Sequence, residues 1–104
     1  MARFANLHLT PDQCAAVWVY GRFRFGSSAR WMELVNSADR IATEANNRTR
    51  STTDTACFLV DDRTLDRLHC MMLEIQEQDE PTGHIAEVIQ GIVTACEKAN
   101  EMIA

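Results

Sequence analysis

A chain of 104 residues with 46% apolar and 24% charged residues has the balance of a globular protein, which excludes a largely disordered chain or a fibrous repeat. Its longest apolar run, residues 14–20, is far shorter than the roughly 20 residues that cross a bilayer, and the first residues lack the basic and apolar regions of a signal segment. We therefore expect one cytosolic domain over residues 1–104.

The net charge of −5 conceals an uneven distribution. Residues 1–53 carry seven basic and four acidic side chains, whereas residues 54–104 carry three basic and eleven acidic ones. Such an asymmetry can hold one half of the chain against the other, pair neighbouring chains, or present an acidic surface to a basic partner.

The four cysteines are widely spaced, and none forms a Cys-x-x-Cys pair. Cys14, Cys70 and Cys96 have apolar neighbours in the sequence. This pattern predicts buried free thiols in a reducing compartment rather than a disulfide framework.

An extended arm over residues 1–9 is expected to lead into a helix over residues 11–23. Thr10 is the predicted N-cap, Pro11 occupies the first helical position, and Gln13 completes a capping box. The alternation of apolar residues over residues 17–25 also fits a strand, so this alternative stays open. In a helix, residues 14–20 are apolar on every side, which predicts deep burial.

The second predicted helix covers residues 28–46, where apolar residues recur at spacings of three and four. A polar loop follows over residues 46–54. Residues 55–60 are either a strand, which would pair with the N-terminal arm, or the first turns of the next helix.

The third predicted helix covers residues 62–78, with Asp61 as N-cap and Val60 and Leu65 as a hydrophobic staple. The last covers residues 84–103. The predicted fold class is therefore all-α: a bundle-like domain of about four amphipathic helices with an extended N-terminal segment and a possible short strand near 55–60.

Residues 14–20 and 70–73 are both apolar right round the helix, which is more apolar surface than a domain of this length has room to bury. A surplus of this kind indicates an interface. We expect a homodimer or another protein partner, with the contact made by Trp18, Tyr20, Cys70 and Met71.

Seven carboxylates fall within twenty positions around the third predicted helix. They are Asp61, Asp62, Asp66, Glu74, Glu77, Asp79 and Glu80. On a rigid helix they would imitate the phosphates of a nucleic acid and occupy a basic groove on another protein, whereas ordinary solubility is the competing interpretation. We therefore expect an inhibitor or adaptor that acts through protein contacts, a type that includes phage-encoded inhibitors such as anti-CRISPR proteins.

The alternative is a nucleic-acid-binding regulator, because residues 17–31 hold five of the seven aromatic residues and three arginines. Rings that stack on bases must face solvent, and core packing of Trp18, Tyr20 and Phe23 is the preferred interpretation here. A helix-turn-helix with its turn at residues 24–28 is another form of the same alternative. The candidate nucleic-acid-binding residues are Arg22, Arg24, Arg30, Arg48 and Arg50.

An enzyme is the third hypothesis. Asp66 with His69, and His84 with Glu87, have the spacing of a carboxylate that orients an imidazole base, but no nucleophile or glycine-rich loop accompanies them. His69 and Cys70 begin a run of soft metal ligands, yet adjacent helical residues point about 100° apart and do not converge on one ion. The sequence therefore predicts no catalytic residue, metal or cofactor.

Overall fold

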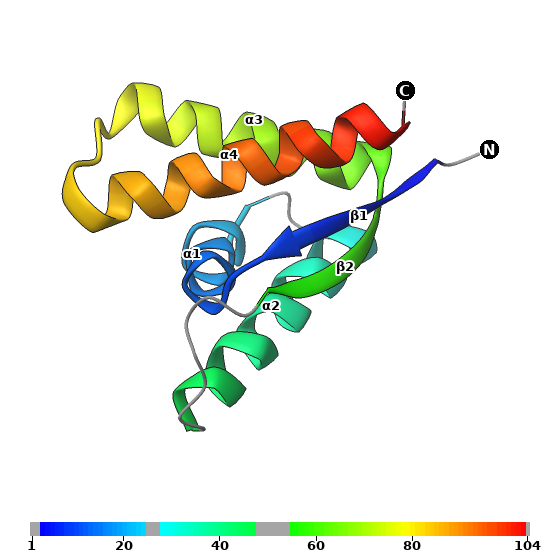
Figure 1. Ribbon diagram of the computed structural model, residues 1–104, viewed down its shortest axis with the longest axis horizontal. Helices are drawn as coiled ribbons and strands as arrows, with labels where there is room; N and C mark the ends of the chain where they lie inside the picture. Colours follow the sequence, from blue (N-terminus) through cyan, green and yellow to red (C-terminus); the bar gives the residue numbers. More distant parts are fainter. Residues whose placement is uncertain (1–2, 25–27, 48–54, 104) are drawn as a thin grey trace. The chain divides into compact units, whose positions relative to one another are not determined.

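The computed structural model describes residues 3–24, 28–47 and 55–103 and contains mainly helices, with one short two-stranded antiparallel sheet (Figure 1). In chain order the elements are β1 (Phe4–Leu9), α1 (Pro11–Gly21), α2 (Ala29–Asn47), β2 (Ala56–Asp61), α3 (Asp62–Gln78) and α4 (Gly83–Ile103). The predicted all-α class is confirmed, and every helix begins and ends within two residues of its expected bounds. Residues 56–61 form a strand that pairs with the N-terminal arm.

Contacts along the chain gather in two compact units, one of Met1–Leu7 with Cys57–Ala104 and one of His8–Ala56. The first unit contains α3, α4 and most of the sheet, and the second contains α1 and α2. Counted over the sequence, the first unit carries ten acidic and four basic residues, a net charge of −6, whereas the second carries five acidic and six basic residues, a net charge of +1. The prediction of a single domain stays a prediction.

The capping box that the sequence predicts starts α1. The Gln13 backbone N–H donates to the Thr10 hydroxyl at 3.3 Å, and the Thr10 backbone N–H donates to the Gln13 side-chain oxygen at 2.9 Å. Two donors that the helix itself leaves without partners are thereby satisfied. The alternative of a strand over residues 17–25 is wrong, because the helix continues to Gly21.

The expected burial of α1 on all sides is also wrong. Cys14 and Val17 are buried, but Trp18 and Tyr20 are half-buried and Val19 is 55% exposed. Successive side chains of a helix point about 100° apart, so only those that face a packed neighbour leave the solvent. Phe23, expected in the core, is 86% exposed.

The apolar stripe of α2 supplies much of the core of its unit. Trp31, Leu34, Val35, Ala38 and Ala42 are buried, as their spacing predicts. The Ser28 carbonyl accepts the first helical hydrogen bond, from the Met32 N–H at 3.0 Å, so Ser28 occupies the N-cap position of α2.

A hydrogen bond of 2.9 Å from the Asp62 N–H to the Arg3 carbonyl continues the pairing of β1 with β2. In an antiparallel ladder this register puts Ala5 opposite Val60 and Asn6 opposite Leu59. Ala5 and Val60 are buried, whereas Asn6 and Leu59 are exposed, in accordance with the period of two along a strand.

Helices α3 and α4 lie side by side and antiparallel, joined by a short connection (Figure 1). Their facing sides are apolar and buried. The buried residues are Leu65, Leu68, Met71, Met72 and Ile75 from α3, and Ile89, Ile92, Val93, Cys96 and Ala99 from α4. Asp61 has the extended backbone of an N-cap but makes no side-chain capping hydrogen bond, while Val60 and Leu65 are both buried at the positions of the predicted staple.

Candidate interaction surfaces

The solvent side of the α3–α4 hairpin is strongly acidic. From Leu68 to Glu97 the sequence has no lysine or arginine and six carboxylates, all of them exposed. They are Glu74, Glu77, Asp79, Glu80, Glu87 and Glu97, and we call this set the acidic hairpin. Each of these side chains can meet a partner without unfolding of the chain.

The acidic residues gather at the end of α3 where the helix itself disfavours them. The last turn of α3 contains no basic residue, and Glu77 lies within it while Asp79 is the C-cap. The C-terminus of a helix carries a partial negative charge, so carboxylates there are destabilising by a few tenths of a kcal/mol to about 1 kcal/mol each. This placement adds no helix stability.

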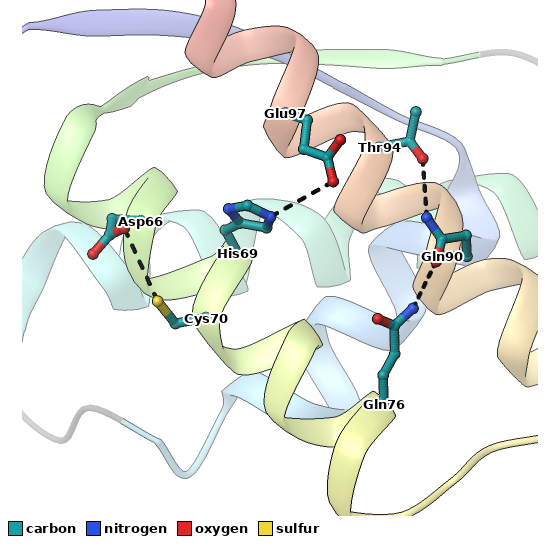
Figure 2. Close-up of polar contacts among 7 residues, drawn as sticks. All are labelled: Asp66, His69, Cys70, Gln76, Gln90, Thr94 and Glu97. Atoms are coloured by element: carbon teal, nitrogen blue, oxygen red, sulfur yellow. Dashed lines mark hydrogen bonds and ion pairs between the residues drawn. The ribbon is translucent and has the colours of Figure 1, made fainter.

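A seam of polar side chains ties α3 to α4 along this surface (Figure 2). The Gln76 amide donates to the Gln90 side-chain oxygen at 2.9 Å, and the Gln90 amide donates to the Thr94 hydroxyl at 3.4 Å. Two turns earlier on α3, His69 Nε2 lies 3.9 Å from Glu97 Oε1, an ion pair whenever the imidazole is protonated. The Gln76–Gln90 hydrogen bond and the His69–Glu97 contact thus join α3 to α4, whereas the Gln90–Thr94 bond lies within α4.

The turn between the helices places Glu80 in the left-handed region, with φ of 43°. Gly83, at the start of α4, has φ of 65°. A glycine adopts this conformation without steric cost, whereas a residue with an L side chain, such as Glu80, adopts it only with strain. Glu80 therefore carries local backbone strain that a glycine at the same position would avoid.

Six of the seven carboxylates expected on the acidic face are exposed, and one is not. Asp61 closes β2 with only 7% of its surface exposed, so its assignment to the partner-binding face is wrong. Asp61 is the last residue of β2, so the helix periodicity from which the face was inferred does not apply to it, and its burial next to the buried Val60 also breaks the alternation of the strand.

The predicted oligomer interface is only partly on the surface. Met71 is 1% exposed and packs in the core, so its assignment to an interface is wrong; Trp18 and Tyr20 are half-buried, and Cys70 is exposed.

The prediction that the thiols are buried fails at Cys57 and Cys70, which are exposed. Burial raises the pKa of the other two, Cys14 and Cys96, to about 12, with a smaller contribution at Cys96 from the neighbouring Glu97 carboxylate.

The end of α1 presents a small surface in which an arginine stacks on aromatic rings. The Arg22 guanidinium carbon lies 5.3 Å from the centre of the Trp18 ring and 4.9 Å from that of Phe23, within the range of cation–π attraction. Val19, one turn earlier, is exposed as well. We call the exposed residues Val19, Arg22 and Phe23 the α1 patch.

The exposure of Val19 and Phe23 differs from the burial that their sequence positions predict. Of the other candidate nucleic-acid-binding residues, Arg24 is half-buried and Arg30 exposed. Arg48 and Arg50 lie outside the described residues.

The candidate catalytic pairs adopt different partners from those expected. His69 turns toward Glu97, while Asp66 lies 4.0 Å from the Cys70 sulfur, so the predicted pairing of Asp66 with His69 is wrong (Figure 2). His84 and Glu87 do pair, at 4.0 Å, on the exposed side of α4.

Among residues 3–24, 28–47 and 55–103 no three His, Cys, Asp or Glu side chains are grouped so that they could hold a metal ion. None of the helices, as far as they are described, has both the length and the apolar content needed to cross a membrane.

No protein-family model matches the chain, and comparisons with curated proteins and with solved structures find no significant match. The surfaces of the molecule itself therefore carry the information about its function.

Proposed function

We propose that the protein is an interaction module whose acidic hairpin binds a basic surface of another protein and so inhibits or recruits it. The observation that carries this proposal is the set of six exposed carboxylates over Leu68–Glu97, a stretch whose sequence contains no lysine or arginine. Three features accompany it: the charges oppose the dipole at the end of α3, Glu80 keeps a strained backbone, and polar side chains cross-link the two helices. Local preferences that a sequence breaks are expected mostly at functional sites.

The chemistry of the surface indicates the kind of partner. Carboxylates held on a rigid pair of helices present negative charge at fixed spacing, which is complementary to lysine and arginine side chains that line a nucleic-acid-binding groove. We therefore favour a partner that handles nucleic acid, as inhibitors of the anti-CRISPR type bind. Two exposed free thiols, Cys57 and Cys70, fit action in a reducing compartment such as the cytosol.

The test is a pull-down with the tagged chain from lysate of its native host, after nuclease treatment, followed by a binding measurement with the purified partner. Glu77→Lys with Asp79→Lys reverses two charges at the C-terminal end of α3, where basic residues stabilise a helix, so a loss of binding is not explained by unfolding. Glu33→Lys with Glu101→Lys is the matched control, since it changes the net charge equally at exposed positions outside the acidic hairpin.

We expect the first variant to weaken binding by at least tenfold and the control to weaken it only slightly, with affinity falling as salt increases. Equal losses from both variants would indicate a general effect of net charge and would contradict a specific acidic surface. Recovery of nucleic acid in place of a protein would contradict the proposal outright.

A second candidate, binding of nucleic acid, is favoured by one observation: Phe23 is 86% exposed beside the stacked Arg22. A base can stack on such a ring while arginine neutralises phosphate. The net charge of −5 opposes this candidate. Binding of a labelled single strand, with a log–log salt slope of about −0.7 for each phosphate contact, would support it.

A further inference from the structure

The α1 patch combines one oriented cation with two exposed apolar side chains. Arg22 follows directly on the helix, with its N–H bonded to the Trp18 carbonyl at 3.1 Å, so its backbone is fixed. The rings of Trp18 and Phe23 lie against the guanidinium group, at 5.3 and 4.9 Å. Stacking uses the faces of this planar group and leaves the N–H donors at its edge directed outward.

A guanidinium group in this setting suits an acceptor with two oxygens, which is a carboxylate or a phosphate. The apolar neighbours Val19 and Phe23 are 55% and 86% exposed. A partner that also covers them with an apolar side chain removes this surface from water, which favours binding. Phosphate on a nucleic acid would approach a chain that already carries a net charge of −5. A protein surface that offers carboxylates beside an apolar side chain meets both requirements.

The chain itself carries such a surface on α3. Leu73 is 43% exposed, and Glu77 follows it at a spacing of four residues, on the same side of the helix. Glu77 belongs to the unit with a net charge of −6, whereas the α1 patch belongs to the unit with a net charge of +1. The charges of the two surfaces are therefore complementary between copies.

We propose that the α1 patch docks on the Leu73–Glu77 surface of a second copy of this chain, with Arg22 paired to the Glu77 carboxylate and Phe23 packed on Leu73. This contact covers part of the acidic hairpin, so a foreign partner and self-association compete for the same carboxylates. The surface is small, which makes the association transient and sensitive to salt.

The experiment is sedimentation of the purified chain over a wide range of concentration at low and high salt. Arg22→Glu and Glu77→Arg, each alone, are expected to weaken self-association at least tenfold. An equimolar mixture of the two variants restores it, because the carboxylate introduced on the α1 patch of one variant then faces the guanidinium group introduced on α3 of the other. Arg40→Glu, an exposed position on α2 with the same charge change, is the control and is expected to associate as the unaltered chain does. Circular dichroism establishes that each variant is folded.

A wild-type chain that stays monomeric at every concentration in low salt overturns the proposal. So does a mixture that fails to recover association, or an Arg40→Glu variant as weak as Arg22→Glu. Binding of a single-stranded oligonucleotide that Arg22→Glu abolishes, with no self-association of the wild-type chain, would assign the α1 patch to nucleic acid instead. The same variant distinguishes this proposal from that of a foreign partner. Arg22→Glu leaves the acidic hairpin intact, so it is expected to lose self-association but to bind the foreign partner at least as well as the wild-type chain.

Discussion

The Trp31 indole N–H donates a hydrogen bond of 2.8 Å to the carbonyl oxygen of Gly21, and the same ring covers the space where a side chain at position 21 would lie. A Cβ atom built on Gly21 would be 2.9 Å from Trp31 Cζ2 and 3.1 Å from Val35 Cγ2. The glycine thus allows the end of α1 to approach α2 closely, and the hydrogen bond satisfies the polar atom of a completely buried tryptophan. The same backbone then leads into the α1 patch.

Gly21→Ala is expected to lower the free energy of unfolding by about 1 to 3 kcal/mol, since it overpacks a rigid ring. In an exposed helical position the same change would stabilise the chain by roughly 0.5 to 1 kcal/mol. Chemical denaturation measures the difference. Trp31→Phe removes the clashing atom, so Gly21→Ala should cost less in that background, and full additivity of the two substitutions would contradict the predicted contact.

The capping box gives a second prediction for the same unit. Thr10→Ala removes the acceptor of the Gln13 N–H and is expected to destabilise the chain by about 0.5 to 2 kcal/mol. Thr43→Ala is the matched control, because Thr43 is exposed in the interior of α2, where alanine is the better helix former. Urea denaturation of both variants should show a loss only for Thr10→Ala.

The helix boundaries were predictable because they depend on residues close in the sequence. The Thr10–Gln13 capping box starts α1 at Pro11, and the spacing of apolar residues gives the length of α2. Pairing of residues 56–61 with the N-terminal arm was foreseen only as one of two alternatives, since a short apolar run fits a strand and a buried helix equally well.

Exposure along the apolar helices was not predictable in the same way. Where all sides of a segment are apolar, periodicity does not identify the side that meets a neighbour, and so the exposure of Val19 and the burial of Met71 were both missed. The acidic hairpin was largely foreseen, because charged side chains stay in water wherever the helix turns. Asp61 was the exception, since it belongs to β2 and not to the helix.

Glu80 offers a test of the cost of keeping a carboxylate in the α3–α4 turn. Its φ of 43° lies in the left-handed region, so Glu80→Gly is expected to raise the free energy of unfolding by up to about 1 kcal/mol, the gain being reduced by the greater freedom of glycine in the unfolded chain. Glu87→Gly, the same substitution inside α4, should lower stability by about 1 kcal/mol. Thermal unfolding of the pair, together with partner binding, separates stability from function. A loss of stability in Glu80→Gly would contradict the predicted strain.

The buried thiols of Cys14 and Cys96 make stability depend on pH in the alkaline range. Burial raises their pKa from 9.0 to about 12, so the folded chain holds these protons at pH values where the unfolded chain has lost them. The contribution to stability is fully present below pH 9 and is lost as the pH rises from 9 to 12, by at most about 1.4 kcal/mol per pH unit for each thiol.

Denaturation of the wild-type chain and of Cys14→Ala with Cys96→Ala, measured from pH 8 upward under reducing conditions, is expected to show a steeper decline for the wild-type chain. Other groups titrate in both proteins, so the difference between the two slopes isolates the thiols. Alkylation at pH 8 should modify Cys57 and Cys70 in the folded chain and all four cysteines only after denaturation. Equal slopes in the two proteins, or rapid native alkylation of Cys14 or Cys96, would show that these thiols are open to water and not held in the core.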